Sequence, residues 1–276
     1  VCRSAISLRL AGICLAVALP TLTFVLAAVL IEEAEQFAGW FGSALSIILA
    51  SMTLAARDLW DHAHAVGSPL QAGNLSAARR AVGMIVGRDT AGLSPSEVAR
   101  ATVETVAESS ADGVVAPLLY LAIGGAPLAL AYKAINTLDS MIGHRDTRYA
   151  DFGWASARLD DLANWIPARL AAILLILGAG LMTRQRESVC RGWRVFLRDG
   201  GEHPSPNSGR PEAAMAGVLG VRLGGTNFYD GIPHNRPTLG LEGRSVKPDD
   251  IVLAAKVMVM ASVLAVLLAI GVRWLV

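Results

Sequence analysis

Long stretches without a charged residue divide the chain into apolar and polar segments. Residues 10–31 and 37–56 contain no charged residue, and residues 251–272 contain only Lys256. A helix needs about 20 apolar residues to cross the hydrocarbon layer of a bilayer. The pattern therefore predicts three membrane-spanning helices, two near the start of the chain and one near its end.

Two further apolar segments, residues 113–132 and 165–183, are less regular. Gly124 and Gly125 interrupt the first segment, and Arg169 interrupts the second. Glycine weakens a helix, and a segment that enters and leaves on one side is tolerated at membrane depth when protein surrounds it. We therefore expect both segments to be re-entrant or broken helices.

Lysine and arginine indicate which side each polar segment faces, because cytoplasmic segments carry an excess of both. Residues 184–250 carry ten lysines and arginines, whereas the link at residues 32–36 carries three glutamates and neither basic residue. Residues 57–112 then lie on the same side as residues 184–250. If both irregular segments return, residues 133–164 face the cytoplasm as well.

Composition narrows the class of protein. Hydrophobic residues make up 53% of the 276 residues and charged residues 17%, against a usual charged share of about 25%. This excludes an ordinary soluble enzyme, and the net charge of +1 gives no general affinity for nucleic acid. We predict an all-α fold, a polytopic integral membrane protein with long cytoplasmic helical segments and a single membrane-embedded domain over residues 1–276.

A stripe of charges marks the polar segment before residue 113. Ser94 and Glu97 predict a capping box that starts a helix. Four charged residues then follow at a spacing of four: Arg100, Glu104, Glu108 and Asp112. A solvated face with an Arg100–Glu104 pair is one interpretation, but three carboxylates at that spacing repel one another. The other interpretation is that the three carboxylates bind a divalent cation, most simply Mg²⁺.

Two polar faces lie between the irregular apolar segments. One has a spacing of three and comprises Lys133, Asn136 and Asp139. The other comprises Arg158, Asp160, Asp161 and Asn164. Charged faces beside a membrane usually meet a cavity, a partner or a substrate. The alternative is mutual pairing that only makes a helix end soluble.

The segment 184–250 is rich in glycine. Gly224 and Gly225 lie close to Asn227, and glycine permits close approach of the backbone to a ligand. Backbone N–H groups in such segments can hold phosphate, although the P-loop pattern is absent. The glycines of this segment are therefore compatible both with structural turns and with a phosphate-binding site.

Longer strings of residues occur in one characteristic order. They are Gly87-Arg88-Asp89-Thr90, Glu104 to Glu108, Asp112-Gly113, Ala131 to Gly143, Ser156 to Asp161, Asn164 to Arg169, Ser205-Pro206-Asn207, Glu212-Ala213, Leu219-Gly220 and Leu223 to Tyr229. With these strings the chain resembles the CobD/CbiB family, the adenosylcobinamide-phosphate synthases of cobalamin biosynthesis. The resemblance covers about residues 54–240.

The resemblance implies a multi-pass enzyme of the cell (inner) membrane with a cytoplasmic active site. Such an enzyme would form an amide bond between aminopropanol, or its phosphate, and a propionate carboxylate of adenosylcobyric acid. The implied cofactors are ATP and Mg²⁺. The implied partners are the corrinoid, the amine, membrane lipid and other membrane-associated enzymes of cobalamin assembly. Two features depart from the family: the chain shows no Asp-Pro and His-Pro element before its first apolar segment, and Ser109 stands where asparagine is expected.

Read with this resemblance, the polar residues receive candidate roles. The candidate catalytic residues are Asp139, Asp160, Asp161 and Arg158. The candidate substrate- and phosphate-binding residues are Arg88, Asp89, Lys133, Asn136, Asn164, Asn207, Glu212, Gly224, Gly225 and Asn227. The candidate Mg²⁺ ligands are Glu104, Glu108 and Asp112. The alternative functions are a non-catalytic membrane sensor of the AmpE type and a small-molecule transporter.

Overall fold

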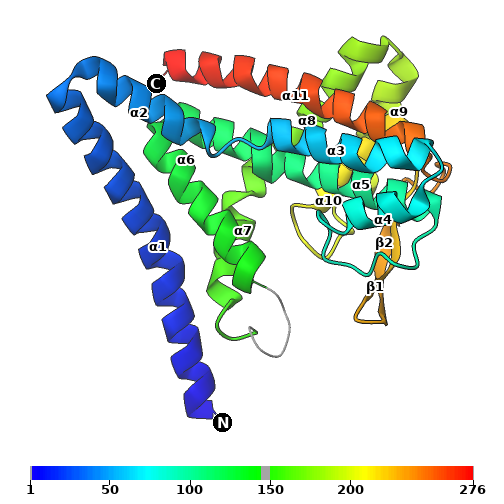
Figure 1. The fold of residues 1–276 in the computed structure, drawn as a ribbon, viewed down its shortest axis with the longest axis horizontal. Helices are drawn as coiled ribbons and strands as arrows, with labels where there is room; N and C mark the ends of the chain where they lie inside the picture. The colour runs from blue at the N-terminus through cyan, green and yellow to red at the C-terminus, as the bar shows by residue number, and fades with distance from the viewer. Residues whose placement is uncertain (1, 144–149, 276) are drawn as a thin grey trace. The chain divides into compact units, whose positions relative to one another are not determined.

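The structure is a computed structural model that describes residues 2–143 and 150–275 (Figure 1). These residues are mostly helical and include one two-stranded sheet, which agrees with the predicted all-α class. The helices in this part of the chain that are long and apolar enough to cross a membrane are Ile6–Phe37, Gly39–Gln71, Pro95–Ile142, Trp165–Thr183 and Pro248–Leu275. The three spans predicted at the two ends of the chain overlap the first, second and last of these.

Contacts within the chain define two compact units. Unit 1 comprises the described residues of 1–54, 116–167 and 266–276, and unit 2 comprises residues 55–115 and 168–265. Each unit is defined by its own contacts. The prediction of a single membrane-embedded domain therefore stays a prediction.

Unit 1 is built around a long first helix. Helix α1 (Cys2–Phe37) packs against α2 (Gly39–Ser51), α6 (Ala116–Ile142) and α7 (Trp154–Ala163). Small residues allow these helices to approach α1, and the buried positions of α1 include Ala16, Ala27 and Ala34. Large apolar residues cover its exposed side: Leu10, Val17, Leu22, Val25, Leu26, Val29 and Leu30. An exposed apolar surface of this kind suits a helix that faces lipid.

Helix α6 is broken at two glycines. Gly124 has φ −136° and ψ 20°, and Gly125 has φ 68° and ψ −168°, so neither residue is helical. The positive φ of Gly125 is readily adopted only without a Cβ atom. The break predicted from the sequence is therefore confirmed. Whether the segments 113–132 and 165–183 cross the membrane or return stays a prediction.

Unit 2 contains the helices that carry most of the long polar segments. They are α3 (Ala56–Gln71), α4 (Leu75–Val82), α5 (Pro95–Ser110), the π-helix η1 (Ala111–Val115), α9 (Arg186–Asp199), α10 (Gly209–Leu219), and parts of α8 (Trp165–Thr183) and α11 (Pro248–Leu275). Helix α10 is buried at every position except Arg210, and it contacts both α9 and α5. The predicted capping box is present, because Ser94 and Glu97 each accept a hydrogen bond from the other's backbone N–H.

A β-hairpin follows α10. Strands β1 (Leu223–Tyr229) and β2 (Ile232–Leu239) are antiparallel, with Asn227 opposite His234 and a bulge between Leu223 and Gly225. The sequence led us to expect glycine-rich turns at Gly224 and Gly225, so the strand is a correction. Its cause is long-range pairing with β2, which local composition does not report.

Candidate functional site

In unit 2, Glu104 is the centre of a buried group of charges. Its Oε2 accepts a hydrogen bond from Arg88 at 2.5 Å, and its Oε1 accepts one from Arg100 at 3.0 Å. The side chains of Arg88, Glu104 and Arg100 are only 6%, 5% and 12% exposed. The predicted Arg100–Glu104 pair is therefore present, but it is a buried ion pair and not part of a solvated face.

The same charges attach strand β1 to helix α5. The backbone N–H of Gly224 donates to Glu104 at 2.8 Å, and Asn227 Oδ1 accepts from both Arg88 (2.6 Å) and Arg100 (3.0 Å). Arg100 also donates to the carbonyl of Gly224. We call Arg88, Arg100, Glu104, Gly224 and Asn227 the arginine–glutamate cluster. It brings together three of the residues predicted to bind phosphate and one predicted metal ligand.

Gly224 is a position that only glycine suits. Its φ is +81°, and a Cβ atom placed on it would lie 2.1 Å from the carbonyl oxygen of Pro237. Its neighbour Gly225 has φ +87°, but a Cβ atom there would meet nothing within 4 Å. Position 224 therefore requires glycine because φ is positive and the two strands approach closely. Position 225 favours glycine only because φ is positive.

Asp89 supports the hairpin rather than the cluster itself. Its backbone N–H donates to the carbonyl of Phe228 at 2.8 Å, and its Oδ2 accepts from the N–H of Gly231 at 2.8 Å. Gly231 lies in the turn between β1 and β2. The carboxylate of Asp89 therefore holds the hairpin in place. Its predicted contact with substrate stays a prediction.

A second set of polar side chains lies at the N-terminal end of α10. Glu108 accepts a hydrogen bond from Ser208 at 2.7 Å, and Arg236 donates to the hydroxyl of Tyr229 at 3.2 Å. Nε2 of His203 lies 3.4 Å from the same guanidinium group. Burial, followed by the charge of Arg236, lowers the pKa of His203. The histidine is therefore neutral at physiological pH and can accept a proton or a hydrogen bond.

Glu212 is the most enclosed carboxylate of this region. It is 2% exposed, and its Oε1 has no hydrogen-bond partner among the described residues. Burial, together with the negative charges of Glu104 and Glu108, raises its pKa well above the usual value. A glutamate in such surroundings holds its proton at a pH where exposed carboxylates are ionised. Asn207, another predicted binding residue, is also buried in this loop.

In unit 1, a different network surrounds Asp160. Its Oδ1 accepts from the amide of Asn164 at 2.9 Å and from the amide of Asn136 at 3.4 Å. The hydroxyl of Tyr132 donates to Oδ1 of Asn164 at 2.8 Å, and the ring of Tyr132 stacks on Tyr120. We call Tyr132, Asn136, Asp160 and Asn164 the Asp160 cluster. Predicted substrate-binding and catalytic residues thus meet between α6 and α7.

The other residues predicted for unit 1 are more accessible. Arg158 is exposed, and Lys133, Asp139 and Asp161 are half-buried. Their positions on α6 and α7 agree with the predicted polar faces. Their roles in catalysis or binding stay predictions.

The predicted metal ligands do not form one site. Among the described residues, no group of three His, Cys, Asp or Glu side chains is arranged to hold a metal ion. Asp112 lies in the π-helix η1, so the expected α-helical stripe ends before it. Both oxygens of Glu104 already accept hydrogen bonds. The geometry fits an ion pair at Glu104 and does not fit a Mg²⁺ site made of these three residues.

Several residues of the unit 2 site were not selected from the sequence. His203 and Ser208 lie near the Ser205-Pro206-Asn207 string, which could have drawn attention to them. Arg236 lies outside the strings, on β2, and its side chain reaches Tyr229 on β1 because the two strands pair. No local signal identifies a residue whose partner is set by strand pairing.

Comparison with known proteins identifies relatives along the chain. A family model described as CobD/Cbib protein matches residues 2–258. The chain is 58% identical over 199 residues to the cobalamin biosynthesis protein CobD of Geobacter metallireducens, which is 72% of this chain and 62% of that protein. It is 46% identical over 277 residues to CobD of Klebsiella pneumoniae subsp. pneumoniae, which is 100% of this chain and 86% of that protein. It is 45% identical to CbiB of Salmonella typhimurium over 87% of this chain and 74% of that protein. No solved structure matches the chain.

Proposed function

Because the chain belongs to the CobD/CbiB family of cobalamin biosynthesis proteins, we propose that it is the amide-forming enzyme that the resemblance implies. In this proposal it joins aminopropanol, or its phosphate, to the propionate carboxylate of adenosylcobyric acid at the expense of ATP. The names of the relatives support a role in cobalamin biosynthesis. The reaction, the substrates and the cytoplasmic location of the site are our proposal.

The observation that carries the proposal is the charge balance of the arginine–glutamate cluster. Two buried arginines face one buried glutamate, so the group keeps one surplus positive charge. Nδ2 of Asn227 is a buried donor without a hydrogen-bond partner among the described residues. A surplus positive charge beside a hydrogen-bond donor that has no acceptor favours the binding of an anionic ligand. Arginine binds phosphate oxygens especially well. We propose that this cluster binds a phosphate group of ATP or of the amine substrate.

The carboxyl groups of Glu108 and Glu212 can interact with the amine substrate. Glu108 is half-buried, and Glu212 is enclosed with a raised pKa. A carboxyl group that holds its proton can donate a hydrogen bond, whereas a neighbouring carboxylate can attract a cation and accept a proton. We propose that Glu108 attracts the ammonium group of the substrate and accepts the proton that must leave before nitrogen attacks the activated carboxyl carbon, and that protonated Glu212 donates a hydrogen bond to the ligand.

The Asp160 cluster suits a different task. Its amides and its tyrosine hydroxyl are hydrogen-bonded to one another, so their directions are fixed. Fixed amide groups can orient the polar side chains of a large ligand without adding net positive charge. We propose that this cluster contacts polar side chains of the corrinoid.

The proposal is tested by turnover of purified protein in detergent with adenosylcobyric acid, aminopropanol phosphate and Mg-ATP. Mass spectrometry of the corrinoid should show the amide product, and omission of ATP should abolish it. Replacement of aminopropanol phosphate by free aminopropanol shows which amine is used. Absence of product with either amine, from protein that remains folded, would refute the proposed activity.

A further inference from the structure

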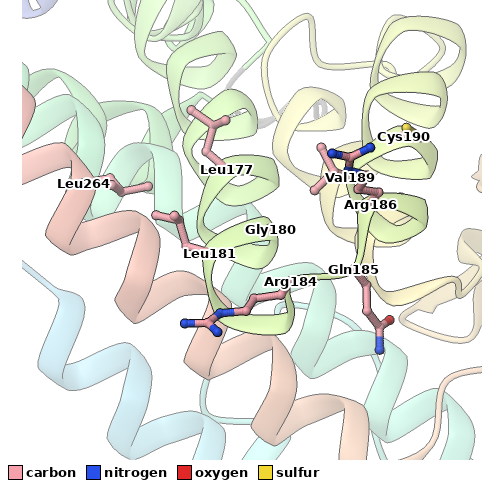
Figure 2. A pocket seen from close by; sticks show the side chains of 9 residues that line it. All are labelled: Leu177, Gly180, Leu181, Arg184, Gln185, Arg186, Val189, Cys190 and Leu264. Carbon is pink, nitrogen blue, oxygen red and sulfur yellow. The ribbon is translucent and has the colours of Figure 1, made fainter.

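Unit 2 contains an apolar pocket away from the polar clusters. It has a volume of about 480 Å³ and lies between α8 and α9, with one wall from α11. Figure 2 shows Leu177 and Leu181 of α8 and Leu264 of α11 on one side, and Val189 and Cys190 of α9 on the other. Pockets of about 300–1,000 Å³ are typical of small-molecule sites.

The pocket lies at the end of a candidate membrane span. Helix α8 is apolar enough to cross a membrane and ends at Thr183, and α9 begins at Arg186. The pocket reaches from Leu177, within the apolar helix, to the polar turn that follows it. One ligand could therefore contact both the hydrocarbon layer and the headgroup layer of the bilayer.

Two arginines lie at the polar end of the pocket. Arg184 extends from the end of α8 beside Leu181, and Arg186 lies on the α9 side (Figure 2). Both are exposed, and neither side chain has an ion-pair or hydrogen-bond partner in the parts of the chain that the structure describes. The adjacent Glu187 lies 3.6 Å from Arg191 instead. The end of the pocket thus carries two uncompensated positive charges.

We propose that this pocket binds one anionic phospholipid. The acyl chain would lie along Leu177, Leu181 and Leu264, and the phosphate would contact Arg184 and Arg186. Basic pockets beside membrane helices favour anionic headgroups, and arginine forms strong charge-assisted hydrogen bonds with phosphate. A zwitterionic lipid would fill the apolar walls equally well but would leave the two charges less balanced. A free phosphate ion would leave the apolar walls uncovered.

Native mass spectrometry tests this directly. The full-length protein, delipidated in a neutral detergent, is titrated with phosphatidylglycerol or with phosphatidylcholine. We expect one phosphatidylglycerol to be retained at least fivefold more than phosphatidylcholine. The double variant Arg184→Gln/Arg186→Gln should lose this preference. The matched variant Arg80→Gln/Arg222→Gln, which removes two exposed arginines outside the pocket, should keep it.

A second readout locates the lipid. Cys190 lines the pocket and is exposed, so it reacts with maleimide after Cys2 and Cys14 are replaced by serine. Added phosphatidylglycerol should slow its modification in the parent and in the Arg80/Arg222 variant, but not in the Arg184/Arg186 variant. Equal retention of both lipids, or an unchanged preference in the Arg184/Arg186 variant, would overturn the proposal. So would a stable dimer that excludes lipid, because a second copy would then occupy the pocket.

Discussion

The cluster in unit 2 is built from full charges, whereas the cluster in unit 1 is built from amides, a hydroxyl and one carboxylate. Glu104 lies between two guanidinium groups, and Asp160 accepts hydrogen bonds from two side-chain amides. A buried charge that loses its partner is far more costly than a buried amide that loses one hydrogen bond. The two clusters should therefore differ sharply in how much protein stability depends on them.

The largest expected effect is that of Glu104→Gln. This change leaves Arg88 and Arg100 buried without their carboxylate, and we expect a loss of about 3–5 kcal/mol in unfolding free energy. The control Glu97→Gln can keep the capping hydrogen bond and removes only a charge from the first turn of α5, so it should cost about 0.3–1 kcal/mol. Thermal unfolding in detergent measures both. A stable Glu104→Gln protein that needs more Mg²⁺ for turnover would instead restore Glu104 as a metal ligand.

A pair of glycine variants tests the attachment of β1. Gly224→Ala combines a positive φ with a steric clash against the carbonyl of Pro237, so we expect a loss of about 2–4 kcal/mol. Gly225→Ala has the unfavourable φ alone and should lose about 1–2 kcal/mol. The same unfolding measurement compares them. Equal losses would mean that close approach of the strands is not what requires glycine at position 224.

In unit 1, Asp160→Asn should affect turnover more than stability. The amide keeps the size of the side chain, and its Oδ1 can still accept from Asn136 and Asn164, but the negative charge is lost. We expect turnover to fall at least tenfold, which corresponds to about 1.4 kcal/mol in barrier. Asp161→Asn changes another candidate catalytic residue on the same helix and shows whether the loss is particular to Asp160. Full activity of the Asp160 variant would remove the cluster from the proposed site.

The smallest expected effect is a change in pH dependence at Glu212. The raised pKa keeps this carboxyl protonated in the folded protein, while the unfolded chain ionises above about pH 4.3. The stability contributed by the protonated group is thus present below that pH and declines as pH rises toward the raised value. The Glu212→Gln variant does not titrate, so its melting temperature relative to the parent should increase from pH 5 to pH 8. A constant or decreasing difference would contradict the raised pKa.

Short-range patterns explain which parts of this molecule could be foreseen. The capping box at Ser94, the Arg100–Glu104 pair and the break at Gly124 each depend on residues within four positions. The meeting of Asn136 with Asp160 was anticipated only in part, because spacing defined the two polar faces but not their contact.

The features that were missed depend on distant segments. Strand β1 exists because β2 pairs with it, and the role of Arg236 follows from that pairing. Asp112 lies in a π-helix that replaces the last α-helical turn, and neighbouring residues give no clear signal for this change. The pairing of Glu104 with Arg88 was not foreseen, because Arg88 lies 16 residues away in a loop.

The proposed reaction takes ATP from the cytoplasm. We therefore predict that the arginine–glutamate cluster and the Asp160 cluster each face the cytoplasm, which requires segments 113–132 and 165–183 to return without crossing. Labelling with a membrane-impermeant maleimide measures this. Ser140, next to the Asp160 cluster on α6, and Glu202, in the loop after α9, are both exposed. Each is replaced by cysteine in a protein without other cysteines. We predict labelling of both in inside-out vesicles and of neither in intact cells. Labelling of Ser140→Cys from outside intact cells would contradict the account.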